Sequence, residues 1–246
     1  MSSVCLTPKE TSDALIQSAV KKTSYLTLER LLLSIMAGAY IALGAQGFMM
    51  AYDNAFLRAA VFPVGLMLIV LVGGELYTGN CLMTFGLIQK KINIREYVLS
   101  LLQVLFGNLI GSLAVAVILY YGGIYNKPEM AEAIVKVAKA KVSLTTSQII
   151  LKGILCNILV ALGVWLATTS KDTTGKLLGC WFPVMLFVFC GYEHSVANMF
   201  FLPLGAIMDN TISMLQILHN LVPAIIGNYI GGGLIIPVIY NKVYYK

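Results

Sequence analysis

Six long apolar stretches limit what this chain can fold into. Each reaches the roughly 20 residues that an α-helix needs to cross the hydrocarbon core of a bilayer. Charged residues make up only 11% of the chain and lie almost entirely between these stretches. Six spans leave no room for a soluble domain, so we expect one all-α membrane domain over residues 1–246. The stretches are Leu31–Met50, Phe56–Ile88, Val98–Tyr121, Ile149–Thr169, Leu177–Ile207 and Leu221–Tyr240.

The distribution of positive charge predicts how the chain crosses the membrane. Of the 17 Lys and Arg residues, eleven lie on the side that holds both termini, five lie on the other side, and Lys152 lies within a span. Because cytoplasmic loops carry an excess of Lys and Arg, we expect a multi-pass cell-membrane protein with both termini in the cytoplasm. Residues 1–25 show no signal-peptide pattern and are interpreted as a cytoplasmic or interfacial segment. This topology accounts for the net charge of +6, so no nucleic-acid partner is predicted.

The second and fifth stretches do not fit a single straight helix. The second, Phe56–Ile88, is 33 residues long. A helix of that length extends about 50 Å, whereas the hydrocarbon core is about 30 Å thick. This stretch contains the polar sequence GGELYTGN at Gly73–Asn80, and the fifth contains GYEHSVAN at Gly191–Asn198. Since neither stretch has room for two full spans and a turn, we expect a broken helix at each polar sequence.

The two polar sequences belong to a longer repeat. Each half of the chain holds three spans, so the second half must cross the membrane in the opposite direction, giving two inverted three-helix repeats. We place the first repeat at 26–121, an extracytoplasmic linker at 122–147 and the second repeat at 148–246. Broken helices are tolerated in a membrane where they are buried in protein or line a cavity, so this pattern is typical of transport proteins. The equivalent positions are Gly73 and Gly191, Glu75 and Glu193, Asn80 and Asn198, Gly44 and Gly163, and the GNLIG and GNYIG motifs that begin at Gly107 and Gly227.

Three motifs carry a resemblance to a known family. They are GGELYTG from Gly73 to Gly79, GILCNILVALGVWLA from Gly153 to Ala167, and YEHSVANMFFLPLG from Tyr192 to Gly205. The chain resembles the formate/nitrite transporter family, and most of all its hydrosulfide channel branch. This resemblance implies an aquaporin-like protomer in membrane lipid, a homopentamer with one pore per protomer, and passage of small monovalent anions. Hydrosulfide, formate, nitrite and chloride are all anions that such a pore would serve.

The resemblance also assigns pore residues. Thr78 and His194 match the central pore pair of the family, Lys141 its conserved lysine and Asn157 the asparagine of its fourth helix. Three further positions match its hydrophobic constrictions, although plain packing would also explain apolar side chains there. They are Phe62, Leu66 and Phe187.

The chemistry of these residues suggests how an anion would pass. A bare anion in a dry constriction costs several kcal/mol or more, because hydrocarbon offers no replacement for hydration. We hypothesise that Thr78 positions His194, and that the anion passes either paired with the imidazolium or transiently as its neutral acid. Lys141 would aim its ammonium inward from a short helix that begins at Pro128 and help to attract anions.

The remaining polar residues of the two breaks are interpreted as structural. Glu75 and Glu193 would accept hydrogen bonds from backbone or side-chain donors and support the breaks, together with Asn80 and Asn198. For Asn198 we expect bonds to freed backbone groups.

Other functions fit the sequence less well. A proton-coupled formate or nitrite transporter stays open as an alternative to a channel. A membrane-embedded enzyme that uses Glu75, Glu193 and His194 lacks a nucleophile motif, and a water or glycerol channel should show paired Asn-Pro-Ala loops, which are absent. No cofactor, metal site or disulfide is predicted, because the five cysteines form no CxxC pair.

Overall fold

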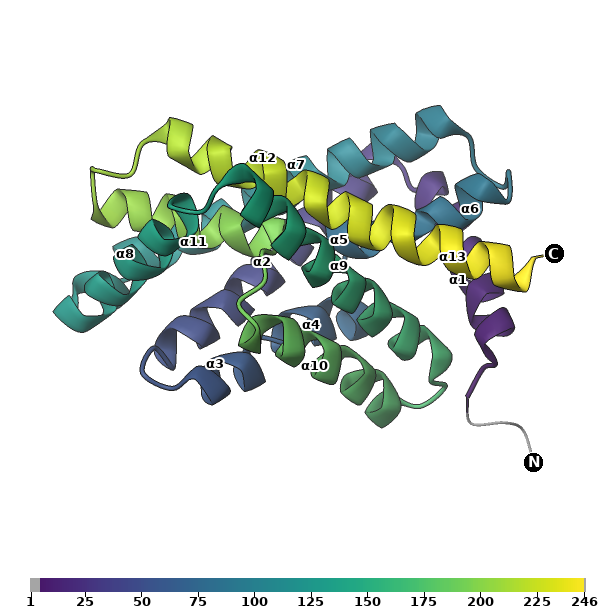
Figure 1. The fold of residues 1–246 in the computed structure, drawn as a ribbon, viewed down its shortest axis with the longest axis horizontal. Helices are drawn as coiled ribbons and strands as arrows, with labels where there is room; N and C mark the ends of the chain where they lie inside the picture. The colour runs from purple at the N-terminus through teal and green to yellow at the C-terminus, as the bar shows by residue number, and fades with distance from the viewer. Residues whose placement is uncertain (1–4, 246) are drawn as a thin grey trace.

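The chain forms an elongated bundle of helices. The computed structural model describes residues 5–245, and in this part the regular structure is helical apart from one isolated β-bridge between Cys5 and Ser170. Both ends of the chain lie at one end of the molecule and α8 (Pro128–Val142) lies at the other (Figure 1). We call these ends the terminal side and the linker side. The predicted all-α membrane fold is confirmed.

The first half of the chain begins with a helix that packs at the terminal side. Its start is fixed by a capping box, in which the Thr7 side chain and the Glu10 side chain each accept a hydrogen bond from the backbone N–H of the other residue. The elements of this half are α1 (Pro8–Ser24), α2 (Thr27–Met50), α3 (Ala55–Val61), α4 (Val64–Val72), α5 (Tyr77–Asn80), a 3₁₀ turn (Cys81–Met83), α6 (Thr84–Ile88) and α7 (Ile94–Tyr121).

The second half repeats this arrangement after a helical linker. The linker consists of a 3₁₀ turn (Ile124–Asn126) and α8, which begins at Pro128 as expected. The elements that follow are α9 (Thr146–Thr169), α10 (Thr173–Phe189), α11 (Ser195–Met208), α12 (Met214–Asn228), a π-helix (Tyr229–Ile235) and α13 (Ile236–Tyr244).

Both predicted helix breaks are present, and they are equivalent. α4 ends at Val72 and α5 begins four residues after Gly73, while α10 ends at Phe189 and α11 begins at Ser195. The glycine at each break has a positive φ, +106° at Gly73 and +66° at Gly191. Residues with a Cβ rarely adopt such angles, so each glycine lets the chain turn out of its helix.

Equivalent glycines also bring the helices of each half into close contact. A Cβ at Gly111 would lie 1.9 Å from the carbonyl oxygen of Ile35, and one at Gly231 would lie 2.2 Å from that of Ile154. Only a glycine therefore allows α7 to approach α2, and the sixth span to approach α9, at these points. The contacts agree with the predicted repeat, because equivalent glycines make equivalent close helix contacts in the two halves.

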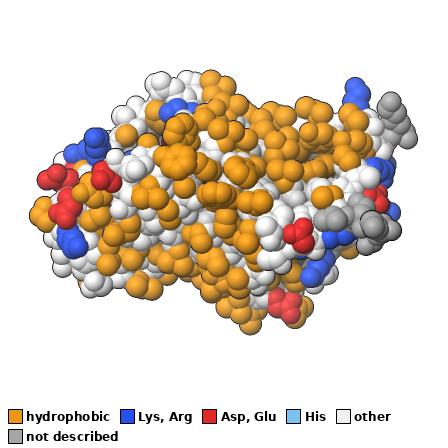
Figure 2. Space-filling model, turned by 90° about the horizontal axis from the view of Figure 1, so that it is seen from below, with side chains coloured by type: hydrophobic (Ala, Val, Ile, Leu, Met, Phe, Trp, Pro, Cys, Tyr) orange, Lys and Arg blue, Asp and Glu red, His pale blue; other side chains and the backbone are white. Residues whose placement is uncertain are grey.

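The surface of the molecule suits a membrane. Figure 2 shows a wide band of hydrophobic side chains, with charged side chains gathered toward the two ends. Among the described residues, five helical segments are long and apolar enough to cross a bilayer. The predicted fifth span is not one of them, because its break divides it into α10 and α11, which are 17 and 14 residues long. The five segments are Thr27–Met50, Ala55–Val72, Ile94–Tyr121, Thr146–Thr169 and Met214–Tyr244.

Candidate functional site

The backbone of the first break is held by an asparagine from α7. The Oδ1 of Asn108 accepts a hydrogen bond from the N–H of Tyr77 (2.9 Å), and its Nδ2 donates to the carbonyls of Glu75 (2.9 Å) and Ser34 (2.8 Å). The side chain is fully buried. It therefore replaces the helical partners that the break takes away from Glu75 and Tyr77.

An equivalent asparagine holds the second break. The Oδ1 of Asn228 accepts from the N–H of Ser195 (2.9 Å), and its Nδ2 donates to the carbonyls of Glu193 (2.8 Å) and Gly153 (2.9 Å). Asn108 and Asn228 are the asparagines of the GNLIG and GNYIG motifs, which the sequence identifies only as equivalent positions of the repeat. A repeated asparagine inside a span is itself a signal, because a polar group in hydrocarbon needs partners.

A lysine, a glutamate and an asparagine form a cluster on the terminal side of the first break. Lys22 of α1 donates to Glu75 Oε1 (2.5 Å) and Asn80 Oδ1 (2.9 Å), and Asn80 Nδ2 donates to Glu75 Oε2 (2.6 Å). The Glu75 side chain is only 4% exposed. We call these residues the first Lys–Glu–Asn cluster. Lys22 was counted only as a surface charge, because nothing in the sequence indicates that α1 folds back against the break.

The second Lys–Glu–Asn cluster lies on the linker side. Lys141 donates to Glu193 Oε1 (2.9 Å), and Asn198 Nδ2 donates to Glu193 Oε2 (2.7 Å) and to Asn220 Oδ1 (2.7 Å). Asn220 Nδ2 also donates to the carbonyl of Lys141 (3.0 Å), which fastens the end of α8. The expectation that Asn198 bonds freed backbone groups is wrong, because its amide donates to two side chains while Asn228 takes the backbone groups.

Thr78 and His194 meet between the two clusters. Thr78 Oγ1 lies 3.1 Å from His194 Nε2, and His194 Nδ1 accepts a hydrogen bond from the N–H of Ala197 (3.1 Å) at the start of α11. Because Nδ1 is an acceptor, the proton of the neutral ring lies on Nε2, which donates to the Thr78 hydroxyl. The Phe187 ring stacks on the imidazole, with centroids 5.6 Å apart.

Two cavities approach this pair from opposite sides. The terminal-side cavity, about 260 Å³, is lined by Lys21, Lys22 and Glu75 among others. The linker-side cavity, about 200 Å³, is lined by Lys141 and His194 among others. Between them lies a central void of about 10 Å³, also lined by His194. A void of this size holds about one water molecule, so the path is narrow at its centre.

Apolar side chains separate the central void from both cavities. Phe62 and Phe187 line the void and the linker-side cavity, and their rings pack edge to face at 5.7 Å. Leu66 and Leu76 line the void and the terminal-side cavity. All four are buried. The three residues matched to constrictions therefore lie together along one path, and Leu76, which the sequence did not indicate, completes it.

Asn157 lies beside the path. Its Nδ2 donates to the carbonyls of Thr78 (3.2 Å) and Asn228 (2.7 Å), and its fully buried side chain is not among those that line the three cavities. The Asn157 amide thus connects α5, the helix after the first break, to Asn228, which holds the second break.

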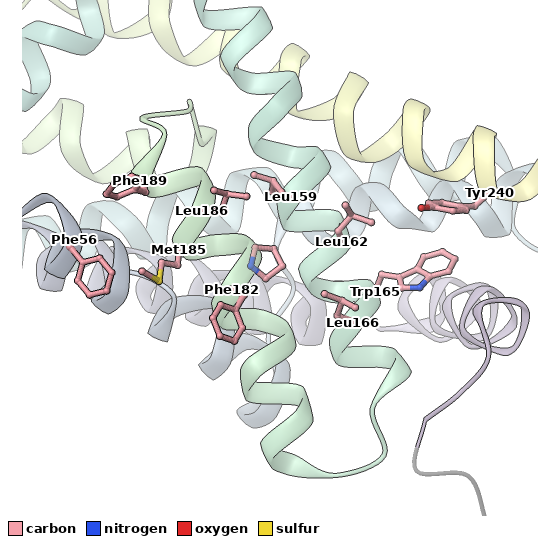
Figure 3. Close-up of a pocket in the computed structure, with 11 residues that line it drawn as sticks. Phe56, Leu159, Leu162, Trp165, Leu166, Phe182, Met185, Leu186, Phe189 and Tyr240 are labelled. Carbon is pink, nitrogen blue, oxygen red and sulfur yellow. The ribbon is translucent and has the colours of Figure 1, made fainter.

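A larger cavity, about 760 Å³, is a groove on the outer surface between α9 and α10 (Figure 3). Its wall includes Leu186 and Phe189 of α10 and Trp165 and Leu166 of α9. Phe189 is 59% exposed. Apolar side chains line it and it faces outward, so it offers no polar path through the molecule.

Comparisons with known proteins identify the family. Residues 9–242 match the model of the formate/nitrite transporter family. The chain is 33% identical to a formate channel of Bacillus thuringiensis, over 97% of this chain and 96% of that protein. Among solved structures it is similar to an FNT family ion channel, with a TM-score of 0.89, 29% identity, and 95% and 98% of the two chains covered. It is also similar to a pentameric formate channel with formate bound, with a TM-score of 0.79, 27% identity, and 89% and 98% covered.

These relatives are channels and transporters, which excludes the membrane-embedded enzyme. Their names do not distinguish the hydrosulfide branch, which stays a prediction. The chain belongs to the formate/nitrite transporter family and is a multi-pass membrane transport protein.

Proposed function

We propose that this protein is a channel that passes small monovalent anions through a pore in each protomer. One observation carries the proposal: cavities from opposite sides end at the same small void beside His194. Formate is the first anion to test, because relatives are named for it. Hydrosulfide, nitrite and chloride are the other candidates, since they share its charge and small size.

Each cavity contains a lysine whose positive charge is partly balanced by a neighbouring carboxylate. Lys22 lies in the terminal-side cavity and Lys141 in the linker-side cavity, and each ammonium is paired with a buried carboxylate. The paired carboxylate keeps the local charge near zero, so the lysine attracts an anion without holding it permanently. Asn80 and Asn198 orient the two carboxylates through their amides.

The centre of the path offers one strong donor. The Nε2–H of His194 points at the Thr78 hydroxyl, and an anion in the void replaces that hydroxyl as the acceptor. Passage as an imidazolium pair or as a neutral acid requires a second proton on Nδ1, which breaks the hydrogen bond from Ala197. The geometry therefore favours a hydrogen-bonded anion over proton transfer in the resting arrangement.

We also propose that the protein is a homopentamer with both termini in the cytoplasm. A homopentamer is supported by the pentameric formate channel that resembles this chain. The excess of Lys and Arg on the terminal side supports a cytoplasmic location for both termini, with the linker 122–147 outside the cell.

Purified protein in liposomes tests this function. The flux of formate, hydrosulfide, nitrite and chloride is measured at two pH values, with empty liposomes as the control. A channel gives an anion-dependent current, whereas a proton-coupled transporter gives a flux that a pH gradient drives against the anion gradient. Permeability to water without any anion flux would contradict the proposal and favour the water-channel alternative.

A further inference from the structure

The sixth span has a feature that its counterpart in the first half lacks. α12 gives way to a π-helix at Tyr229–Ile235 before α13 continues, whereas α7 is α-helical through the equivalent segment. π-Helical turns inside α-helices are rare and frequently lie at functional sites. This one contains three consecutive glycines, Gly231, Gly232 and Gly233, and it packs against α9.

The middle glycine faces Asn157. A Cβ at Gly232 would lie 2.3 Å from Asn157 Nδ2 and 2.8 Å from its Cγ. These distances are far inside the 3.5–4.0 Å at which nonbonded carbon atoms pack. A Cβ at Gly231 would instead meet the carbonyl of Ile154, and one at Gly233 would meet the ring of Tyr229. Of the three glycines, Gly232 alone makes room for the Asn157 amide.

The position of this amide depends on that space. Asn157 Nδ2 makes its two hydrogen bonds to Thr78 and Asn228, but its buried Oδ1 has no hydrogen-bond partner in the protein. The two carbonyls that accept from Nδ2 and the surface that Gly232 presents therefore orient the amide. Its bond to the Thr78 carbonyl acts on the residue whose hydroxyl meets His194.

The first half has an equivalent contact between its spans, but the polar residue and the glycine occupy each other's positions. Ser112 of α7 stands where the sixth span has Gly232, and Gly38 of α2 stands where α9 has Asn157. The Ser112 hydroxyl lies 3.2 Å from the carbonyl of Gly38 and 3.5 Å from that of Val196. Val196 is the repeat equivalent of the threonine at the pore centre. In each half, one polar side chain contacts the helix that follows the break of the other half: Ser112 contacts α11 and Asn157 contacts α5. A glycine lies beside each of these side chains, Gly38 beside Ser112 and Gly232 beside Asn157.

We infer that Gly232 is a positioning residue for the pore: its missing side chain sets the Asn157 amide against the Thr78 carbonyl and so fixes Thr78 toward His194. The inference rests on the proposed function, because the pair it positions lies at the centre of the proposed path. It also explains the π-helix, whose glycines bring this turn against α9.

A swap of residue types tests the inference. Asn157→Gly removes both hydrogen bonds of the amide. We expect formate flux in liposomes to fall about tenfold, which corresponds to about 1.4 kcal/mol, because the Thr78 carbonyl loses its donor. Asn157→Gly with Gly232→Ser copies the Gly38 and Ser112 arrangement. We expect the flux of this double variant to be at least about threefold higher than that of Asn157→Gly, which is half of the tenfold loss on a logarithmic scale.

A matched control keeps the composition and moves the serine by one residue. Asn157→Gly with Gly233→Ser places the hydroxyl where it does not face position 157, and it should recover nothing. Equal recovery in both double variants, or no recovery at Gly232→Ser, overturns the inference. The unfolding temperatures of the same variants in detergent should follow the same order, and this readout does not depend on transport. A wild-type protein that passes none of the four candidate anions would instead count against the proposed function.

Discussion

At the scale of single residues, the site is a set of buried polar groups that hold one another in place. Glu75 and Glu193 each accept hydrogen bonds from a lysine and an asparagine, and Thr78 meets His194 between them. A polar group in such surroundings costs free energy unless it is paired. Variants that remove one partner should therefore distinguish residues that stabilise the fold from residues that act on the anion, because stability and flux can be measured separately.

Thr78→Val keeps the shape of the side chain and removes its hydroxyl. His194 Nε2–H then lacks its acceptor, and the ring is less well fixed at the centre of the path. We expect anion flux in liposomes to fall roughly fivefold to tenfold, in line with one buried hydrogen bond. Thr168→Val is a suitable control, since its hydroxyl bonds only the Val164 carbonyl within α9, and it should keep wild-type flux.

Lys141→Ala leaves the Glu193 carboxylate buried without its cation. We expect the free energy of unfolding to fall by about 3 kcal/mol and anion flux to fall with it. Lys141→Ala with Glu193→Gln removes both charges, so it should restore most of the stability but not the flux. If the double variant recovered full flux, Lys141 would not be needed to attract anions, and its proposed role would be wrong.

Lys139→Ala is the control for this pair. Lys139 is half exposed and pairs with Asp209, beyond the end of α11. The hydrogen bonds from Lys139 and Thr211 lower the pKa of Asp209 to about 2, so the Asp209 carboxylate stays ionised throughout a flux assay near neutral pH. Because the pair lies away from both pore cavities, its loss should leave flux unchanged.

At the scale of helices, the two breaks are held by Asn108 and Asn228. Each side chain accepts from one backbone N–H of its break, donates to one backbone carbonyl of the break, and donates to a second carbonyl on the neighbouring helix. The glycines at positive φ let the chain leave the helix, and the asparagines make the resulting loop stable. Neither break would persist in hydrocarbon without such partners.

Asn108→Ala should destabilise the protein more than loss of an exposed cap. It orphans the N–H of Tyr77 and the carbonyl of Glu75, both buried, and we expect a cost of about 2–4 kcal/mol in the free energy of unfolding. Asn54→Ala removes only the N-cap of α3, with an expected cost of about 1 kcal/mol. Denaturation in detergent compares the two, and equal costs would contradict the role given to Asn108.

The sequence predicts the spans and both breaks because length and hydropathy control them. It also identifies Phe62, Leu66, Phe187 and His194, which line one path, and Thr78, which contacts His194, although through a family resemblance rather than through spacing. It does not indicate Lys22 or Leu76, whose roles depend on how α1 and the first break fold against the bundle. The π-helix is likewise missed, because glycines beside an apolar run are compatible with an ordinary close helix contact.

At the scale of the whole molecule, two inverted halves enclose one path along the long axis. The terminal side and the linker side each carry a Lys–Glu–Asn cluster and a cavity, and the narrow part lies midway between them. The hydrophobic band on the face shown in Figure 2 fits the bilayer across this path. The proposed orientation is testable because exposed loops lie at both ends.

Single cysteines in a background without native cysteines report this orientation. Glu129→Cys lies on the exposed start of α8 and Lys91→Cys in the loop after α6. A membrane-impermeant thiol reagent added to intact cells should label position 129 and not position 91. The reverse result would place both termini outside the cell.

The most direct test of the pore centre is formate flux through His194→Ala in liposomes. Among the residues that the structure describes, His194 alone lines both the central void and the linker-side cavity and carries a polar hydrogen. If this donor replaces lost hydration, its removal should lower flux at least about tenfold in a protein that still elutes as one species. Wild-type flux through His194→Ala would contradict the account.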